Sequence, residues 1–214
     1  MFPDTAVRIP AAGVTLDADV AVPDTARGVV LFAHGSGSSR RSPRNRMVAE
    51  HLRGQGFGTV LADLLTPEEE ERDMLTGELR FDIGLLAGRV IALVDWAAGP
   101  GPLHDLPVGL FGASTGAAAA LVAAAERPGV VRAVVSRGGR PDLAPDALTR
   151  VRAPTLLIVG AQDHQVVALN QQAAAVLAAP HELLLVPGAT HLFEEPGALP
   201  EVAEQAARWF AGHL

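Results

Sequence analysis

The sequence predicts an α/β protein in which helices cover both faces of a mainly parallel sheet. Short apolar runs alternate with longer helical segments along the chain, as in repeated β–α–β units. The runs are almost continuously apolar, which is typical of parallel strands buried on both faces. We expect these strands at residues 28–33, 58–63, 107–111, 130–136, 154–160 and 182–186.

Turn and capping signals place the remaining elements. Residues 7–10 and 14–22 predict a hairpin ahead of the first parallel strand. Ser42 and Pro43 fit the cap and first residue of a helix that runs to about Arg53. Further helices are expected over residues 81–98, from residue 117, over residues 166–177 and from about residue 200.

The acidic segment 66–73 (TPEEEERD) has two interpretations. Its carboxylates could form an acidic binding patch. Alternatively, Thr66 and Pro67 are the cap and first residue of another helix, in whose first turn carboxylates suit the helix dipole. The capping pattern favours the helix.

Composition indicates a single domain over residues 1–214. Hydrophobic residues make up 49% of the chain, enough for one large core. There is no cysteine and the seven histidines lack ligand spacing, so we expect neither a metal nor a cofactor. A net charge of −7 argues against nucleic acid as a partner. Because no signal peptide or membrane-length apolar stretch is apparent, we expect a cytoplasmic protein without a membrane partner.

The pentapeptide Gly112-Ala113-Ser114-Thr115-Gly116 lies between a predicted strand and a predicted helix. In that setting a serine occupies a sharp, strained turn that exposes its hydroxyl above the sheet. Glycines are needed on both sides because side chains there would collide with the strand and the helix. A structural turn is the alternative, and the strand-before, helix-after context favours a nucleophile elbow at Ser114.

A serine nucleophile needs a histidine base and a carboxylate that orients it. Asp163 follows one predicted strand and His191 follows the next, so both are expected at the carboxyl edge of the sheet. The chain order Ser114, Asp163, His191 matches the order found with nucleophile elbows. Asp142 and Asp146 follow an earlier strand and are alternative acids, although strand-end placement favours Asp163.

The glycine-rich loop His34-Gly35-Ser36-Gly37-Ser38-Ser39 follows a predicted central strand. Its backbone can turn an amide toward the site, and we expect the Ser36 and Thr115 N–H groups to form an oxyanion hole. A phosphate-binding loop is the alternative interpretation. It is disfavoured because Arg40 stands where a dinucleotide fingerprint requires glycine or alanine.

The chain resembles the α/β-hydrolase superfamily, and more closely its small dienelactone-hydrolase-like serine hydrolases. The resemblance runs from about Gly28 to the C-terminus and rests on HGSGSSRRSPRNR (34–46), DLLTPEEEE (63–71), GASTG (112–116), SRGGRP (136–141), Asp163 and THLFEE (190–195). Domains of this type also occur fused to phosphoribosyltransferase domains. Dienelactone hydrolases proper use a cysteine nucleophile, whereas this chain has serine.

The resemblance implies hydrolysis of small carboxylic esters or lactones through an acyl-enzyme on Ser114. A thioesterase or acyltransferase would use the same residues, and a ligand-binding or regulatory protein could share the scaffold. The sequence leaves open whether the chain forms a homo-oligomer.

Two arginines are candidate substrate contacts, because a guanidinium can hold a carboxylate or phosphate by forked hydrogen bonds. Arg137 lies just beyond a strand end, and Arg44 belongs to the basic loop Arg40, Arg41, Arg44 and Arg46. A solvated surface is the alternative for that loop. The segment 137–150 is too short for a lid domain, so we expect an open site with a minimal lid or none.

Overall fold

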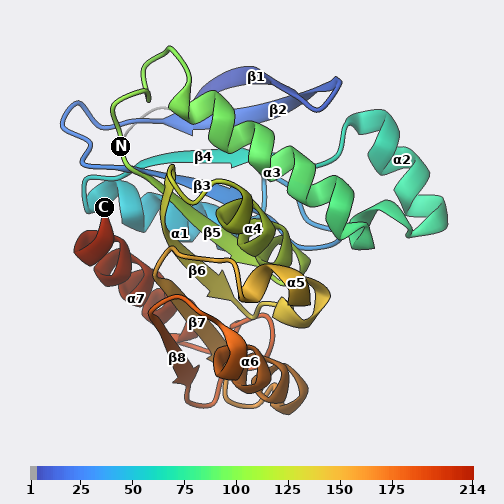
Figure 1. Cartoon of the computed structure of the whole chain (residues 1–214), viewed down its shortest axis with the longest axis vertical. Helices are drawn as coiled ribbons and strands as arrows, with labels where there is room; N and C mark the ends of the chain where they lie inside the picture. Colours follow the sequence, from blue (N-terminus) through green and yellow to red (C-terminus); the bar gives the residue numbers. More distant parts are fainter. Residues whose placement is uncertain (1–3) are drawn as a thin grey trace.

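The computed structural model describes residues 4–214 and contains an eight-stranded sheet, shown edge to edge in Figure 1. The strand order is β1-β2-β4-β3-β5-β6-β7-β8. The strands are β1 (Thr5–Ala11), β2 (Val14–Ala21), β3 (Val29–Ala33), β4 (Gly58–Ala62), β5 (Val108–Ala113), β6 (Val131–Arg137), β7 (Thr155–Gly160) and β8 (His181–Val186).

The sheet is parallel from β4 to β8, and an antiparallel hairpin closes one edge. β1 pairs with β2 and β2 pairs with β4 in antiparallel register, whereas every other neighbouring pair is parallel. The central strands β3, β4, β5 and β7 are buried along their whole length, which explains their unbroken apolar runs. The predicted hairpin and parallel strands are thus confirmed.

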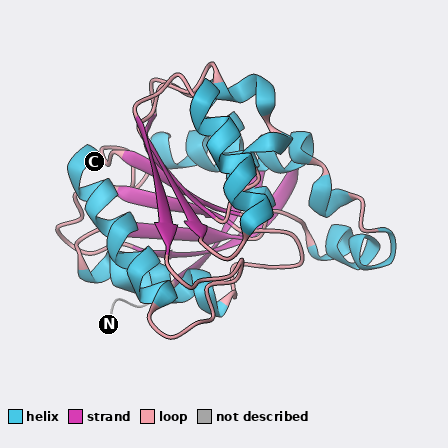
Figure 2. Cartoon of the chain, turned by 90° about the horizontal axis from the view of Figure 1, so that it is seen from below, coloured by secondary structure: helices cyan, strands magenta, loops and turns pink. Residues whose placement is uncertain are grey.

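Helices cover both faces of this sheet, as Figure 2 shows from below. α1 and α7 pack on one face; α3 and α4 pack on the other, where α5 and the end of α6 join the same apolar core. The helices are α1 (Pro43–Gly54), α2 (Pro67–Thr76), α3 (Ile83–Ala98), α4 (Thr115–Glu126), α5 (Pro145–Leu148), α6 (His164–Val176) and α7 (Ala198–His213), with short 3-10 turns η1 (Leu79–Phe81) and η2 (Pro141–Leu143). The arrangement is the α/β-hydrolase fold.

Capping decides where two of the helices begin. α3 starts at Ile83 rather than Phe81, because the Asp82 side chain accepts the Leu85 N–H at 2.9 Å and ends the preceding 3-10 turn. α2 carries the predicted cap: Thr66 accepts the Glu69 N–H, and the Glu69 carboxylate accepts the Thr66 N–H. In the part of the chain that the structure describes, no helix is long and apolar enough to cross a membrane.

α2 stands apart from the two helical layers, beyond the end of α3 in Figure 1. An ion pair between Glu69 and the buried Arg89 ties its first turn to the body of the protein. Arg89 of α3 donates to the Glu69 carboxylate at 2.8 Å and to the Ala11 carbonyl at 2.6 Å. This outlying helix forms one wall of the site described below.

Candidate functional site

Ser114 has the backbone conformation of a nucleophile elbow. Its φ of 51° and ψ of −120° lie in a region that a non-glycine residue rarely adopts. A Cβ on Gly112 would lie 2.4 Å from the Ala117 Cα, and one on Gly116 would lie 2.2 Å from the Ala33 carbonyl oxygen. Both glycines are therefore required by close approach of backbone, as the sequence predicts.

His191 and Asp163 meet at the carboxyl edge of the sheet. His191 Nδ1 lies 2.7 Å from Asp163 Oδ2. Because an ionised carboxylate only accepts hydrogen bonds, Nδ1 carries the proton and Nε2 of a neutral ring is free to accept one. The other Asp163 oxygen caps α6 by accepting the Val166 N–H at 3.4 Å. The cap fixes the carboxylate, and the carboxylate orients the imidazole.

Asp142, the alternative acid, forms an ion pair with Arg140. Arg140 donates to both of its oxygens, from Nε at 2.8 Å and from Nη2 at 2.7 Å. This hydrogen bonding by Arg140 lowers the pKa of Asp142. The structure thus brings His191 to Asp163 and not to Asp142.

The serine and the histidine are brought together by the turn after β6. The Ser114 N–H donates to the Arg137 carbonyl at 3.1 Å. The next residue, Gly138, has a φ of 52°, and a Cβ there would lie 3.5 Å from His191 Nδ1. Within residues 4–214 no hydrogen bond joins the Ser114 hydroxyl to His191; such contacts often tighten only when substrate binds.

The glycine-rich loop lies against the elbow. A Cβ on Gly35 would sit 3.1 Å from the Ser114 Cβ, which places the Ser36 amide close to the nucleophile. Thr115 is the first residue of α4, whose dipole favours negative charge at that end. Neither the Ser36 nor the Thr115 N–H donates to another group within residues 4–214, so both remain available to an oxyanion.

His34 anchors this loop, a role that its isolated position in the sequence did not reveal. The Leu64 N–H donates to its Nε2 at 3.0 Å, and its Nδ1 lies 3.0 Å from the Gly35 carbonyl. Burial lowers the pKa of His34, although the Gly35 carbonyl and the Asp63 and Glu70 charges oppose that effect. A neutral imidazole therefore joins the loops after β3 and β4.

A cavity of about 210 Å³ lies between the glycine-rich loop and the wall formed by α2 and η1. Its lining combines the loop residues 34–38 with apolar side chains of Leu65, Met74 and Leu86. The residues of this wall come after β4 in the chain, whereas the segment 137–150, considered above for a lid, comes after β6. The segment 137–150 itself holds only the short η2 and α5 and forms no lid domain, as expected.

An ion pair between Arg80 and the buried Asp73 holds this wall in place. Arg80 Nε donates to Asp73 Oδ2 at 2.5 Å, and the Leu79 and Arg80 amides donate to Oδ1. Burial alone would raise the pKa of Asp73, but the hydrogen bonds from Arg80 and Leu79 lower it. Both side chains line the cavity. The acidic segment is thus a helix, as predicted, and its last acid shapes the site.

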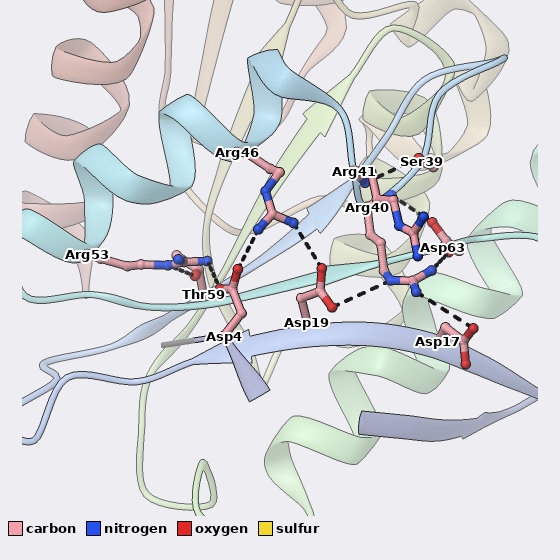
Figure 3. A network of polar contacts seen from close by, with 10 residues as sticks. All are labelled: Asp4, Asp17, Asp19, Ser39, Arg40, Arg41, Arg46, Arg53, Thr59 and Asp63. Carbon is pink, nitrogen blue, oxygen red and sulfur yellow. Dashed lines mark hydrogen bonds and ion pairs between the residues drawn. The ribbon is translucent and has the colours of Figure 1, made fainter. Parts of the chain in front are cut away.

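The basic loop after β3 divides into structural arginines and one that faces the site. Figure 3 shows Arg40 among Asp17, Asp19 and Asp63, and Arg46 between Asp4 and Asp19. These two arginines join the loop and α1 to the sheet, so neither a phosphate loop nor a free basic patch is formed by them. Arg44 instead pairs with Glu194, three residues beyond His191, at 3.2 Å.

The other arginine expected to contact substrate, Arg137, is buried beneath the loop that carries His191. Its guanidinium lies 5.9 Å from the centre of the Phe193 ring. No cluster of histidines and carboxylates able to hold a metal ion occurs within residues 4–214.

The sequence and the fold have known counterparts. The model of the dienelactone hydrolase family matches residues 16–212. Proteins from two strains of Mycobacterium tuberculosis, each described as a putative phosphoribosyl transferase, are 57% identical over 211 residues. The match covers 99% of this chain and 47% of each relative, so the chain spans about half their length.

Solved structures agree with the family match. A dienelactone hydrolase from Anabaena variabilis superposes with a TM-score of 0.98 at 56% identity, covering 100% of this chain and 99% of the other. Est1E from Butyrivibrio proteoclasticus superposes with a TM-score of 0.80 at 17% identity, covering 97% and 98%. The second likeness concerns the fold alone.

Proposed function

Because the chain belongs to the dienelactone hydrolase family, we propose that it is a serine hydrolase of small carboxylic esters or lactones, with Ser114 as nucleophile. The observation that carries the proposal is the 2.7 Å contact between His191 Nδ1 and Asp163 Oδ2 beside a strained serine. Support for Ser114 as the proton donor comes from its elbow, which bonds to the Arg137 carbonyl just before Gly138, the residue that borders the His191 ring.

In the proposed reaction, His191 Nε2 takes the hydroxyl proton as Ser114 Oγ bonds to the substrate carbonyl carbon. The tetrahedral intermediate collapses, the alcohol leaves with the proton from His191, and an acyl-enzyme remains. Water deprotonated by the same nitrogen then releases the acid. Asp163 stabilises the imidazolium in both halves and keeps its Nδ1 proton in place.

The negative oxygen of the tetrahedral intermediate would accept hydrogen bonds from the Ser36 and Thr115 amides. Both donors are fixed before substrate arrives: one by the loop that His34 anchors and the other by the start of α4. Preorganised donors of this kind are commonly worth about 3 kcal/mol each in transition-state stabilisation.

The cavity beside the glycine-rich loop is the proposed pocket for the acyl group or lactone ring. Its volume of about 210 Å³ suits a short group. Its lining combines the apolar side chains of Leu65, Met74 and Leu86 with the charged residues Asp63, Glu70, Asp73 and Arg80. A thioester would react through the same protein atoms, so rates with matched esters and thioesters decide whether the leaving group is an alcohol or a thiol.

A fluorophosphonate probe tests the proposal directly. We expect one adduct, on Ser114, and hydrolysis of p-nitrophenyl acetate by the wild-type protein. Ser114→Ala should abolish the adduct and leave only the weak catalysis supplied by binding and the oxyanion hole. Ser36→Ala is the matched control, because it removes a neighbouring hydroxyl and keeps the backbone donor. An adduct on any other residue contradicts the assignment of the nucleophile.

A further inference from the structure

Arg137 is a buried cation without a partner. Its residue is only 9% exposed, and within residues 4–214 neither Nε nor Nη1 makes a hydrogen bond. Arg89, which is also buried, has a carboxylate and a carbonyl oxygen as acceptors. Burial of an uncompensated charge is costly, and buried charges in proteins are normally paired.

The positive charge of Arg44 adds to this imbalance. Burial, together with the charge of Arg44, lowers the pKa of Arg137 to about 10. Arg44 Nε is likewise buried and without a hydrogen-bond partner in the described chain. Its Nη1 binds Glu194, whose side chain is 66% exposed. Of these two guanidinium groups only that of Arg44 has a carboxylate partner, and this carboxylate lies at the protein surface.

This pair of arginines adjoins the proposed catalytic residues. The Arg137 carbonyl accepts the Ser114 N–H, and the following residue, Gly138, borders the His191 ring. Phe193 and Glu194 continue the chain from His191 and contact Arg137 and Arg44 respectively. Any group bound by both arginines would lie next to the site.

We propose that Arg137 and Arg44 form an anion subsite for a phosphate group carried by the substrate. That the bound molecule is a substrate rests on the proposed hydrolase function. That the subsite binds an anion rests on the unpaired arginines alone. Three buried guanidinium nitrogens lack acceptors, and a phosphate monoester offers three terminal oxygens. Its near-dianionic charge also balances two cations better than a carboxylate does.

Glu194 occupies the outer side of this subsite. Because its carboxylate is largely exposed, an incoming phosphate can replace it on Arg44 without leaving that guanidinium unpaired. Glu194 thus competes with the ligand for Arg44. Removing its charge should therefore strengthen binding, whereas removing either arginine should weaken it.

The first experiment measures binding of inorganic phosphate by isothermal titration calorimetry. We expect a Kd of about 1 mM or tighter for the wild type and for Ser114→Ala. Arg137→Gln and Arg44→Gln should each weaken binding on the order of 10- to 100-fold, as loss of a charge-assisted hydrogen bond does. Glu194→Gln should strengthen it. Arg132→Gln, at the exposed amino end of the same strand, is the control and should change nothing.

Thermal unfolding keeps this test decisive. If Arg137→Gln fails to fold, the phosphate affinities of Arg137→Lys, which retains the charge, and of Arg44→Gln are compared with that of the wild type. Absence of phosphate binding by the wild type overturns the subsite. So does an equal loss of binding in Arg132→Gln, or tighter binding of succinate than of phosphate.

The second experiment separates the subsite from the hydrolase proposal. We compare kcat/KM for p-nitrophenyl esters of phosphoglycolic acid and of uncharged methoxyacetic acid. We expect the wild type to prefer the phosphorylated ester and Arg137→Gln to lose that preference while still cleaving the neutral one. Phosphate binding without hydrolysis of either ester refutes the hydrolase and keeps the subsite. Equal ratios in both proteins refute the role in substrate recognition and keep the hydrolase.

Discussion

Arg140 binds both carboxylate oxygens of Asp142, at 2.8 and 2.7 Å, so the second candidate acid is engaged in an ion pair while Asp163 binds His191. The Arg140 amide also donates to the Ser114 carbonyl at 3.2 Å. One residue thus connects the elbow to the turn after β6 and holds Asp142 in a structural role.

The two acids should differ sharply on substitution. Asp163→Asn is expected to lower kcat on the order of 10⁴-fold, because the amide no longer holds the required imidazole tautomer. Asp142→Asn should lower kcat far less, since it disturbs only the pair with Arg140. Steady-state kinetics with p-nitrophenyl acetate measures both, and a larger loss in Asp142→Asn would exclude Asp163 as the acid.

The elbow glycines should not tolerate a methyl group. Gly116→Ala places a Cβ 2.2 Å from the Ala33 carbonyl oxygen, so backbone must move, at a cost of roughly 3 kcal/mol or more in stability. Gly88→Ala is the matched control in the interior of α3, where a Cβ meets no atom within 4 Å. There alanine should stabilise by about 0.5–1 kcal/mol. Urea denaturation of both variants compares them, and equal stabilities would contradict the packing described.

Acid should weaken the anchor of the glycine-rich loop. His34 has a lowered pKa in the folded protein, so the unfolded chain binds its proton first. Stability from this residue is present above about pH 6.5, the ordinary imidazole value, and declines as the pH falls below it. A charged ring would also lose the acceptor for the Leu64 N–H.

Thermal unfolding from pH 8 to pH 5 checks this expectation. The melting temperature of the wild type should fall below about pH 6.5, and that of His34→Gln should fall less over the same interval. The variant should start from a lower stability at pH 8, because it replaces a well-packed ring. Parallel curves for the two proteins would show that His34 does not control the acid response.

The α2 wall should limit the acyl chain. Each CH₂ buried in the cavity is expected to raise kcat/KM about fourfold, from about 0.8 kcal/mol of transfer free energy. The rise should stop once the 210 Å³ is filled, after a few carbon atoms. Measuring kcat/KM for esters from acetate to palmitate locates this limit. Met74→Ala should extend it, because the smaller side chain enlarges the cavity at the α2 wall. A continuous rise to palmitate would mean that the wall opens.

The sequence by itself determined the order of strands and helices and the residues of the elbow. Apolar runs bounded by glycine and polar residues indicate buried strands. The glycines around Ser114 indicate, even without a structure, that the backbone of the turn lies close to neighbouring backbone. Asp163 and His191 could be singled out because each follows a strand, and parallel strands end at one edge. These signals are local in the chain.

Only the tertiary structure decided which polar groups meet. The members of the Arg140–Asp142 pair and of the Asp73–Arg80 pair lie within seven residues of each other and depend on the turns that the packed chain adopts there. The hydrogen bond from the Leu64 amide to His34 depends on how two separate loops approach in space. The same holds for Arg40 and Arg44, which lie four residues apart and yet differ entirely in their surroundings. A charged side chain carries no local signal of its partner, because the energy that selects the partner comes from burial and distance after the chain has packed.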